Sequence, residues 1–316
     1  MFFRQLHLIG KRTQGVAIAI LLASGVLASE QELVPFRVGV SHMILPDVRE
    51  SDVAASVKVW GDAVFSAHNI RREVVPATFS DAEEMRRALR NEEVDLAIIR
   101  AKELFALEAE LSLDRILFYS KRGKTTTEYL LLTKRDGGMD SLADLEGKSI
   151  VFAEHAWLGM GHMWLETLLL EKTGRIPAGY FGFVSGKSKT LNAALGVFLG
   201  QADACVVTRN SMEIIEELNP QIGLSLQEVE VSPAFVPALI CPRKSLSIDR
   251  MDELYNAVVD MHKDPQGAQI LTVFKVDRLV AGSVEQLATT REWHERHAAL
   301  KARVGSGDAR VPEVGP

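Results

Sequence analysis

Cysteine is scarce in this sequence: two of the 316 residues, Cys205 and Cys241. Two cysteines form no disulfide framework, so the fold must depend on an apolar core, for which 47% hydrophobic residues are ample. Both cysteines lie in apolar, strand-like runs, and we expect two buried free thiols. A disulfide between them is the alternative.

Basic residues are not in excess either. The 36 Lys and Arg residues are outnumbered by 42 Asp and Glu residues, which gives a formal net charge of −6. Because the chain has no excess of basic residues to neutralise a phosphate backbone, we expect no nucleic-acid partner. The length suits one or two domains. The sequence contains no internal repeat and no low-complexity tract.

The apolar run 15–27 is too short to span a bilayer comfortably, but it has the length of a signal-peptide core. Three basic residues precede it: Arg4, Lys11 and Arg12. Residues 26–28 (Val-Leu-Ala) form a small-residue cleavage site. We therefore predict a signal peptide over residues 1–28, with the mature chain starting at Ser29 and exported to the periplasm. An uncleaved membrane anchor is the alternative.

No cysteine lies near this cleavage site, so we expect no lipid anchor. Removal of residues 1–28 takes away three basic residues and no acidic one, which leaves a more acidic mature chain.

The mature chain alternates strand and helix signals. Short apolar runs predict strands at 36–41, 72–76, 94–99, 116–119, 129–133, 149–152, 180–185, 204–208 and 235–241. Helical periodicity occurs at 52–68, 80–91, 162–170, 191–199 and 211–218, and in most of 248–304. Ser80 and Glu83 have the spacing of a capping box. This order predicts an α/β protein, with a frayed tail at 305–316.

The strand predicted at 149–152 is followed by Gly159, Gly161 and a helix. A helix start offers free backbone N–H groups and a partial positive charge, and small residues let a ligand approach them. The stretch therefore suits an anion. An ordinary strand–helix unit with a glycine-rich turn is the alternative, because two glycines alone are a weak signal.

Several short segments follow one another in a specific order along nearly the whole mature chain. They are residues 36–40 (Phe-Arg-Val-Gly-Val), 88–89, 94–97 (Val-Asp-Leu-Ala), 131–134 (Leu-Leu-Thr-Lys), 141–148 (Ser-Leu-Ala-Asp-Leu-Glu-Gly-Lys), 195–204 and 232–233 (Ser-Pro). Their order and spacing resemble the phosphate/phosphite/phosphonate-binding family, the periplasmic solute-binding subunits of ABC importers.

The resemblance implies a two-lobed type II periplasmic binding protein fold, each lobe a mixed sheet flanked by helices, with a ligand between the lobes. Residues 29–130 and 236–304 would form lobe 1, and residues 131–235 would form lobe 2. Two crossing segments near residues 130 and 235 would join them, with a hinge near Thr133 and Phe235.

In this family a Ser-Thr-Ser-Gly-like run at the start of the helix after the central strand holds the oxyanion. Here residues 157–161 read Trp-Leu-Gly-Met-Gly, so Gly161 matches and the hydroxyl residues are absent. The backbone donors remain. Trp157 and Met160 instead indicate a partly apolar or aromatic ligand, or a site filled by the protein's own side chains.

Ligands bind at the carboxyl ends of strands in open α/β sheets. Arg100, Lys187 and Arg209 follow strands and could pair with an anionic group; for each alone, a solvated surface charge is the alternative. The predicted ligand-binding residues are Ser41, His42, Thr78, Arg100, Trp157, Gly159, Met160, Gly161, His162, Lys187, Ser188, Thr208 and Arg209.

Other motifs do not support an enzyme. Residues 182–188 are one position short of a phosphate-binding P-loop, and residues 294–297 lack the spacing of a zinc protease. Glu154, His155 and His162 fit no standard metal site. We expect no catalytic residues, no metal and no cofactor.

The sequence is compatible with two functions. The first is a monomeric solute-binding protein that delivers a small anionic ligand to the permease of an ABC importer. The second is a periplasmic sensing module of the same fold that acts with a membrane receptor or sensor kinase.

Overall fold

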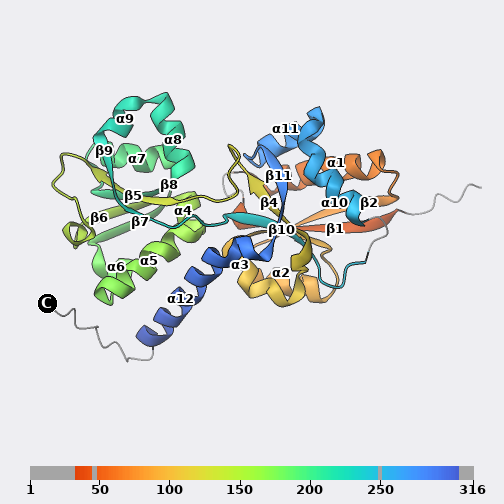
Figure 1. The fold of residues 1–316 in the computed structure, drawn as a ribbon, viewed down its shortest axis with the longest axis horizontal. Helices are drawn as coiled ribbons and strands as arrows, with labels where there is room; N and C mark the ends of the chain where they lie inside the picture. Colours follow the sequence, from red (N-terminus) through yellow and green to blue (C-terminus); the bar gives the residue numbers. More distant parts are fainter. Residues whose placement is uncertain (1–32, 45–47, 248–250, 306–316) are drawn as a thin grey trace, which may run out of the picture. The chain divides into compact units, whose positions relative to one another are not determined.

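The computed structural model describes residues 33–44, 48–247 and 251–305. The predicted signal peptide and all but the first residue of the predicted tail lie outside these ranges. No described helix is both long and apolar enough to cross a membrane. The described chain contains two mixed sheets, each flanked by helices, as predicted (Figure 1).

The first sheet has six strands in the order β11-β4-β10-β3-β1-β2. β1 runs parallel to both β2 and β3, whereas β10 and β11 are antiparallel to their neighbours. The strands are β1 (Val34–Ser41), β2 (Arg72–Phe79), β3 (Leu96–Arg100), β4 (Ile116–Ser120), β10 (Ala238–Pro242) and β11 (Arg278–Gly282).

Alternate residues of these strands face two separate apolar layers, because side chains along a strand point to opposite faces. Ile98 and Leu117 belong to one layer, and their neighbours Ile99 and Phe118 belong to the other. α1 (Glu50–Ala67), α10 (Met251–Asp260) and α11 (Pro265–Val273) cover the first layer. α2 (Ala82–Arg90) and α3 (Ala101–Leu107) cover the second.

The second sheet has five strands in the order β7-β6-β8-β5-β9. They are β5 (Tyr129–Lys134), β6 (Ser149–Ala153), β7 (Phe183–Ser188), β8 (Ala204–Thr208) and β9 (Leu226–Val231). The helices of this part are α4 (Glu154–Leu158), α5 (Met160–Thr173), α6 (Pro177–Tyr180), α7 (Thr190–Phe198), α8 (Arg209–Leu218) and α9 (Pro220–Ser225).

Two local predictions need correction, and two strands were missed. The cap of α2 is Asp81, whose Oδ1 accepts from the Glu84 N–H at 2.8 Å, whereas Ser80 donates to the Glu84 carboxylate. The strand predicted from residue 180 begins only at Phe183, since Pro177 starts a helical turn. β9 and β11 were not predicted. Both are half-exposed strands at sheet edges; β9 alternates apolar and polar residues, and β11 has only three apolar residues in a segment that was predicted to be mainly helical.

Residues 121–128 and 232–237 connect the two sheets. They pair with each other, since Thr127 and Phe235 exchange two backbone hydrogen bonds of 2.8 and 2.9 Å. Thr133, which we expected near the hinge, lies inside β5, where its hydroxyl donates to the Met139 carbonyl at 2.9 Å. The connection therefore centres on Thr127 and Phe235.

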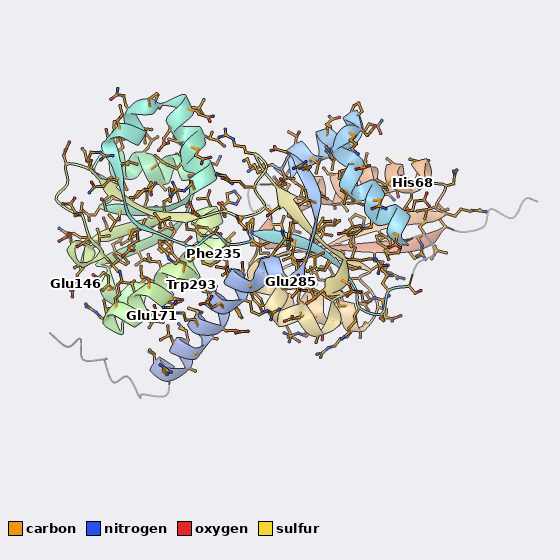
Figure 2. All side chains as sticks on the ribbon, in the orientation of Figure 1. His68, Glu146, Glu171, Phe235, Glu285 and Trp293 are labelled. Carbon is orange, nitrogen blue, oxygen red and sulfur yellow. The ribbon has the colours of Figure 1, made fainter. Side chains whose placement is uncertain are left out.

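The C-terminal helix α12 (Ala288–Gly305) contacts both sheet units, although its sequence position assigns it to lobe 1. Arg291 forms an ion pair with Glu108, just after α3, and Arg296 forms one with Glu171 on α5. Between them, Trp293 packs edge-on against Phe235, with 5.9 Å between ring centroids (Figure 2). α12 thus lies along the connection between the sheets.

Glu166 on α5 anchors the far end of α12. Its buried carboxylate is 2.9 Å from both His297 Nε2 and Lys301 Nζ. The hydrogen bond to His297, supported by Lys301, lowers the pKa of Glu166 to about 2. A depressed carboxyl pKa stabilises the fold above the ordinary pKa, and this contribution is lost as the pH falls toward the depressed value.

We expect Glu166→Gln to lower the free energy of unfolding at pH 7 by about 2–3 kcal/mol. The difference from wild type should shrink as the pH falls from 5 to 2, where wild-type Glu166 becomes protonated. Urea unfolding at several pH values measures it. Glu146→Gln is the control, because the ion pair of Glu146 with Arg175 is exposed and should have little effect. A difference that stays constant with pH would contradict this assignment.

Candidate functional site

A cavity of about 200 Å³ lies where the ends of β3, β4 and β8 meet the connecting segments. Its polar lining consists of Arg100, Tyr119, Lys121, Lys124, Thr125, Thr126, Thr127, Tyr129, His155, Thr208, Asn210, Ser211 and Lys275. Four of these side chains are cationic, and none of the described lining residues is a carboxylate. The cavity thus presents positive charge in a chain that is acidic overall, an arrangement that favours anions.

Arg100 ends β3 and is only 6% exposed. Its Nε donates to the Met43 carbonyl, and its Nη2 is 3.5 Å from the Ile44 carbonyl. Desolvation lowers the pKa of Arg100, against the field of Tyr129 and Glu103. Within the described residues its guanidinium has no ion pair. A buried charge without a counter-charge is costly, so a bound anion would gain a charge-assisted bond here.

The carboxylate nearest in sequence, Glu103, is already engaged. Its Oε1 accepts from the Ser41 hydroxyl at 2.8 Å, and its Oε2 accepts from the Arg100 backbone N–H at 2.9 Å. Glu103 therefore fixes the backbone at the strand ends and leaves the guanidinium of Arg100 to the cavity.

Tyr119 and Tyr129 line the same cavity and were missed by the sequence analysis. The Tyr119 hydroxyl is buried and has no hydrogen-bond partner among the described residues. The Tyr129 hydroxyl accepts from the Met160 backbone N–H at 3.1 Å. Burial raises the pKa of both phenols, so each remains a neutral donor. The sequence signal that could have found them is their position: the two tyrosines lie on either side of residues 121–128, which connect the two sheets.

Tyr129 also explains the two glycines at the start of α5. A Cβ at Gly159 would lie 2.5 Å from the Tyr129 hydroxyl oxygen, and a Cβ at Gly161 would lie 2.6 Å from Tyr129 Cδ1. Gly159, Met160 and Gly161 are buried and do not line the cavity. The glycines therefore make room for the tyrosine ring at the helix start where the sequence analysis placed the anion.

Of the predicted site residues whose side chains the structure describes, Arg100 and Thr208 line the cavity. Thr208 caps α8, and its Oγ1 also donates to the Ser211 hydroxyl at 2.8 Å. Arg209 is instead paired with Glu128 and Glu228, which raise its pKa.

The remaining predicted residues lie elsewhere. His42 Nδ1 is 3.0 Å from Glu50, and the Thr78 hydroxyl donates to the same carboxylate at 3.2 Å, so both belong to a separate polar cluster. His162 packs against Phe152 and Glu166, and burial lowers its pKa. The side chains of Trp157, Lys187 and Ser188 lie outside the described set.

A wider hollow of about 1090 Å³ lies between α1, α10 and α11. It is lined largely by alanine, valine and carboxylate side chains and is remote from the strand ends. Its charge is opposite to what an anion requires, so it is the weaker candidate despite its size. Among the described residues no group of three or more His, Cys, Asp or Glu could hold a metal ion. Cys205 and Cys241 are buried free thiols in different sheets, and burial raises the pKa of each to about 12.

Comparison with known proteins decides the family. Residues 43–287 match the family model described as the periplasmic substrate-binding protein of a phosphonate ABC transporter. The chain belongs to this family. It is therefore a periplasmic solute-binding protein of the ABC-importer type, and the family is one of transport proteins rather than enzymes. No curated protein matches the sequence.

Similarity to solved structures shows that this chain has the two-lobed type II fold. A Xanthomonas citri protein bound to chloride is 15% identical with a TM-score of 0.63, covering 85% of this chain and 99% of its own. The binding component of a Pseudomonas aeruginosa phosphonate transporter is 16% identical, with a TM-score of 0.58 and 89% and 99% covered. A Prochlorococcus marinus protein in complex with methylphosphonate has the same identity and TM-score, with 83% and 97% covered.

The packing of Tyr129 at the helix start gives a stability prediction. Gly159→Ala should destabilise the protein by about 1–3 kcal/mol, because the added methyl group overlaps the Tyr129 hydroxyl and the His155 carbonyl. Gly196→Ala is the matched control. Its methyl group would point into open space within α7, so it should stabilise the protein by about 0.5–1 kcal/mol. Denaturant unfolding measures both, and an unaffected Gly159→Ala would contradict the packing.

Proposed function

We propose that this family member captures a small anionic solute in the cavity at Arg100 and delivers it to the permease of an ABC importer. The observation that carries the proposal is the buried guanidinium of Arg100, which lacks an ion pair among the described residues and lines a cavity with three lysines. The methylphosphonate and chloride bound by the similar proteins support an anion as the ligand.

The same proposal assigns the parts of the chain. Residues 1–28 are a signal peptide cleaved after Ala28, and the mature chain acts as a monomer. Residues 29–130 and 236–304 form one lobe, and residues 131–235 form the other. α12 lies in the first lobe by sequence and also contacts α5 of the second. A sensing role with a membrane receptor is less favoured, because the family description names a transporter.

Ligand capture is proposed to close the lobes by bending at the connecting segments around Thr127 and Phe235. The two backbone hydrogen bonds between these residues hold the segments together, so both can bend as one unit. α12 follows the same axis, with Trp293 against Phe235 and ion pairs on either side.

We expect Arg100→Ala to weaken binding on the order of thirtyfold or more, since loss of one partner of a buried charge pair costs about 2–5 kcal/mol. A thermal-shift screen of sulfate, phosphate, methylphosphonate, methanesulfonate, acetate and benzoate first identifies a binding anion. Isothermal titration with that anion then compares the variants.

Arg87→Ala is the charge-matched control, because Arg87 is exposed on α2 and does not line the cavity. It should bind as wild type does. If Arg100→Ala remains folded by circular dichroism and binds the anion with unchanged affinity, the anion is held elsewhere and the proposed site is wrong.

A further inference from the structure

The Arg100 end of the cavity is built from hydrogen-bond donors. The guanidinium of Arg100 has donors only, whatever its surroundings. The Tyr119 hydroxyl has no partner among the described residues. The Tyr129 hydroxyl already accepts from the Met160 N–H, so its own proton is available to donate. All three side chains line the same cavity.

No carboxylate is found among the described residues that line the cavity. Glu103 uses both carboxylate oxygens on Ser41 and on the Arg100 backbone. Glu154 contributes to the field at Arg100 but does not line the cavity. The other titratable groups around the cavity are His155, Lys121, Lys124 and Lys275. None of these is an anionic acceptor for a proton carried by a ligand.

We propose that this end selects a fully ionised head group, one that presents acceptors only, over a head group that carries a proton. Sulfonates, carboxylates and phosphonate dianions meet this condition, whereas a singly protonated phosphonate or phosphate does not. The inference rests on the proposed function and specifies its ligand class. The physical reason is that a P–OH group facing these three donors finds no carboxylate among the described lining residues to accept its proton. The neutral acceptors of the lining, such as Thr127 and Ser211, form weaker hydrogen bonds than a charged acceptor would.

The buried Tyr119 hydroxyl has a second consequence. Its oxygen is buried and has no hydrogen-bond partner among the described residues, so in the free protein it should lower the stability of the fold. Bound anion supplies the missing acceptor. Tyr119→Phe should therefore raise the melting temperature of the free protein and weaken anion binding about tenfold or more, since a hydrogen bond to a charged group is lost.

Tyr180→Phe is the matched control, since its buried hydroxyl donates to the Leu142 carbonyl at 2.7 Å and does not line the cavity. It should lower the melting temperature and leave anion affinity unchanged. If Tyr119→Phe lowers the melting temperature, the hydroxyl already has a partner in the free protein. If the variant binds the anion as tightly as wild type does, Tyr119 does not contact the anion. Either result contradicts the inference.

The direct test is titration calorimetry of wild-type protein with methanesulfonate and methylphosphonate between pH 6 and 8.5. Methanesulfonate carries no proton in this range, so its affinity should be nearly constant. Any change in its affinity with pH would come from the protein, for example from His155, and can be subtracted. Methylphosphonate affinity should rise relative to it by about tenfold per pH unit below the second pKa of the phosphonate, because one proton must leave before binding.

The outcomes separate the two proposals. If methylphosphonate binds through Arg100 with an affinity that follows methanesulfonate at every pH, this inference is overturned and the proposed function stands. If neither anion binds and Arg100→Ala changes no affinity found in the screen, the proposed function itself fails.

Discussion

The burial of the Arg100 guanidinium without an ion pair among the described residues is the constraint on which the proposed site depends. Arg100 is placed at the end of β3 by the sheet and is fixed there by Glu103, which binds its backbone rather than its side chain. The carbonyls of Met43 and Ile44 satisfy part of the guanidinium. The guanidinium forms no ion pair among the described residues, and a bound anion would offset the charge of this desolvated cation.

Tyr129 connects this charge to the rest of the second sheet. Its ring fills the space left by Gly159 and Gly161, and its hydroxyl satisfies the first N–H of α5. A helix start that would otherwise attract an anion is therefore closed by an internal side chain. In the proposed site a phenol therefore takes the place of the backbone N–H groups as a donor, and the proposed position of the anion is at Arg100 and the connecting segments.

Strand and helix periodicity predicted the α/β order, because these patterns are local signals. The two mixed sheets were expected only from the resemblance to the family. Arg100 was named because it follows a strand, and its role in binding stays a prediction. The sequence analysis missed β9 and β11, whose alternating or short patterns owe their pairing to partners far along the chain. It also interpreted the Gly-x-Gly turn as room for a ligand. The tyrosine that fills this room lies 30 residues earlier in sequence, and only tertiary packing brings it there. Arg209 was another local match, but it forms ion pairs with Glu228 on β9 and with Glu128 just before β5.

The anion is proposed to bind at Arg100 and not at the start of α5. Crystals grown with selenate, a fully ionised tetrahedral oxyanion, test this most directly through the anomalous scattering of selenium. We predict an anomalous peak within hydrogen-bond distance of the Arg100 guanidinium and the Tyr119 hydroxyl, with Tyr129 still bonded to the Met160 N–H. A peak at the backbone N–H groups of α5, with the Tyr129 ring displaced, would contradict the claim.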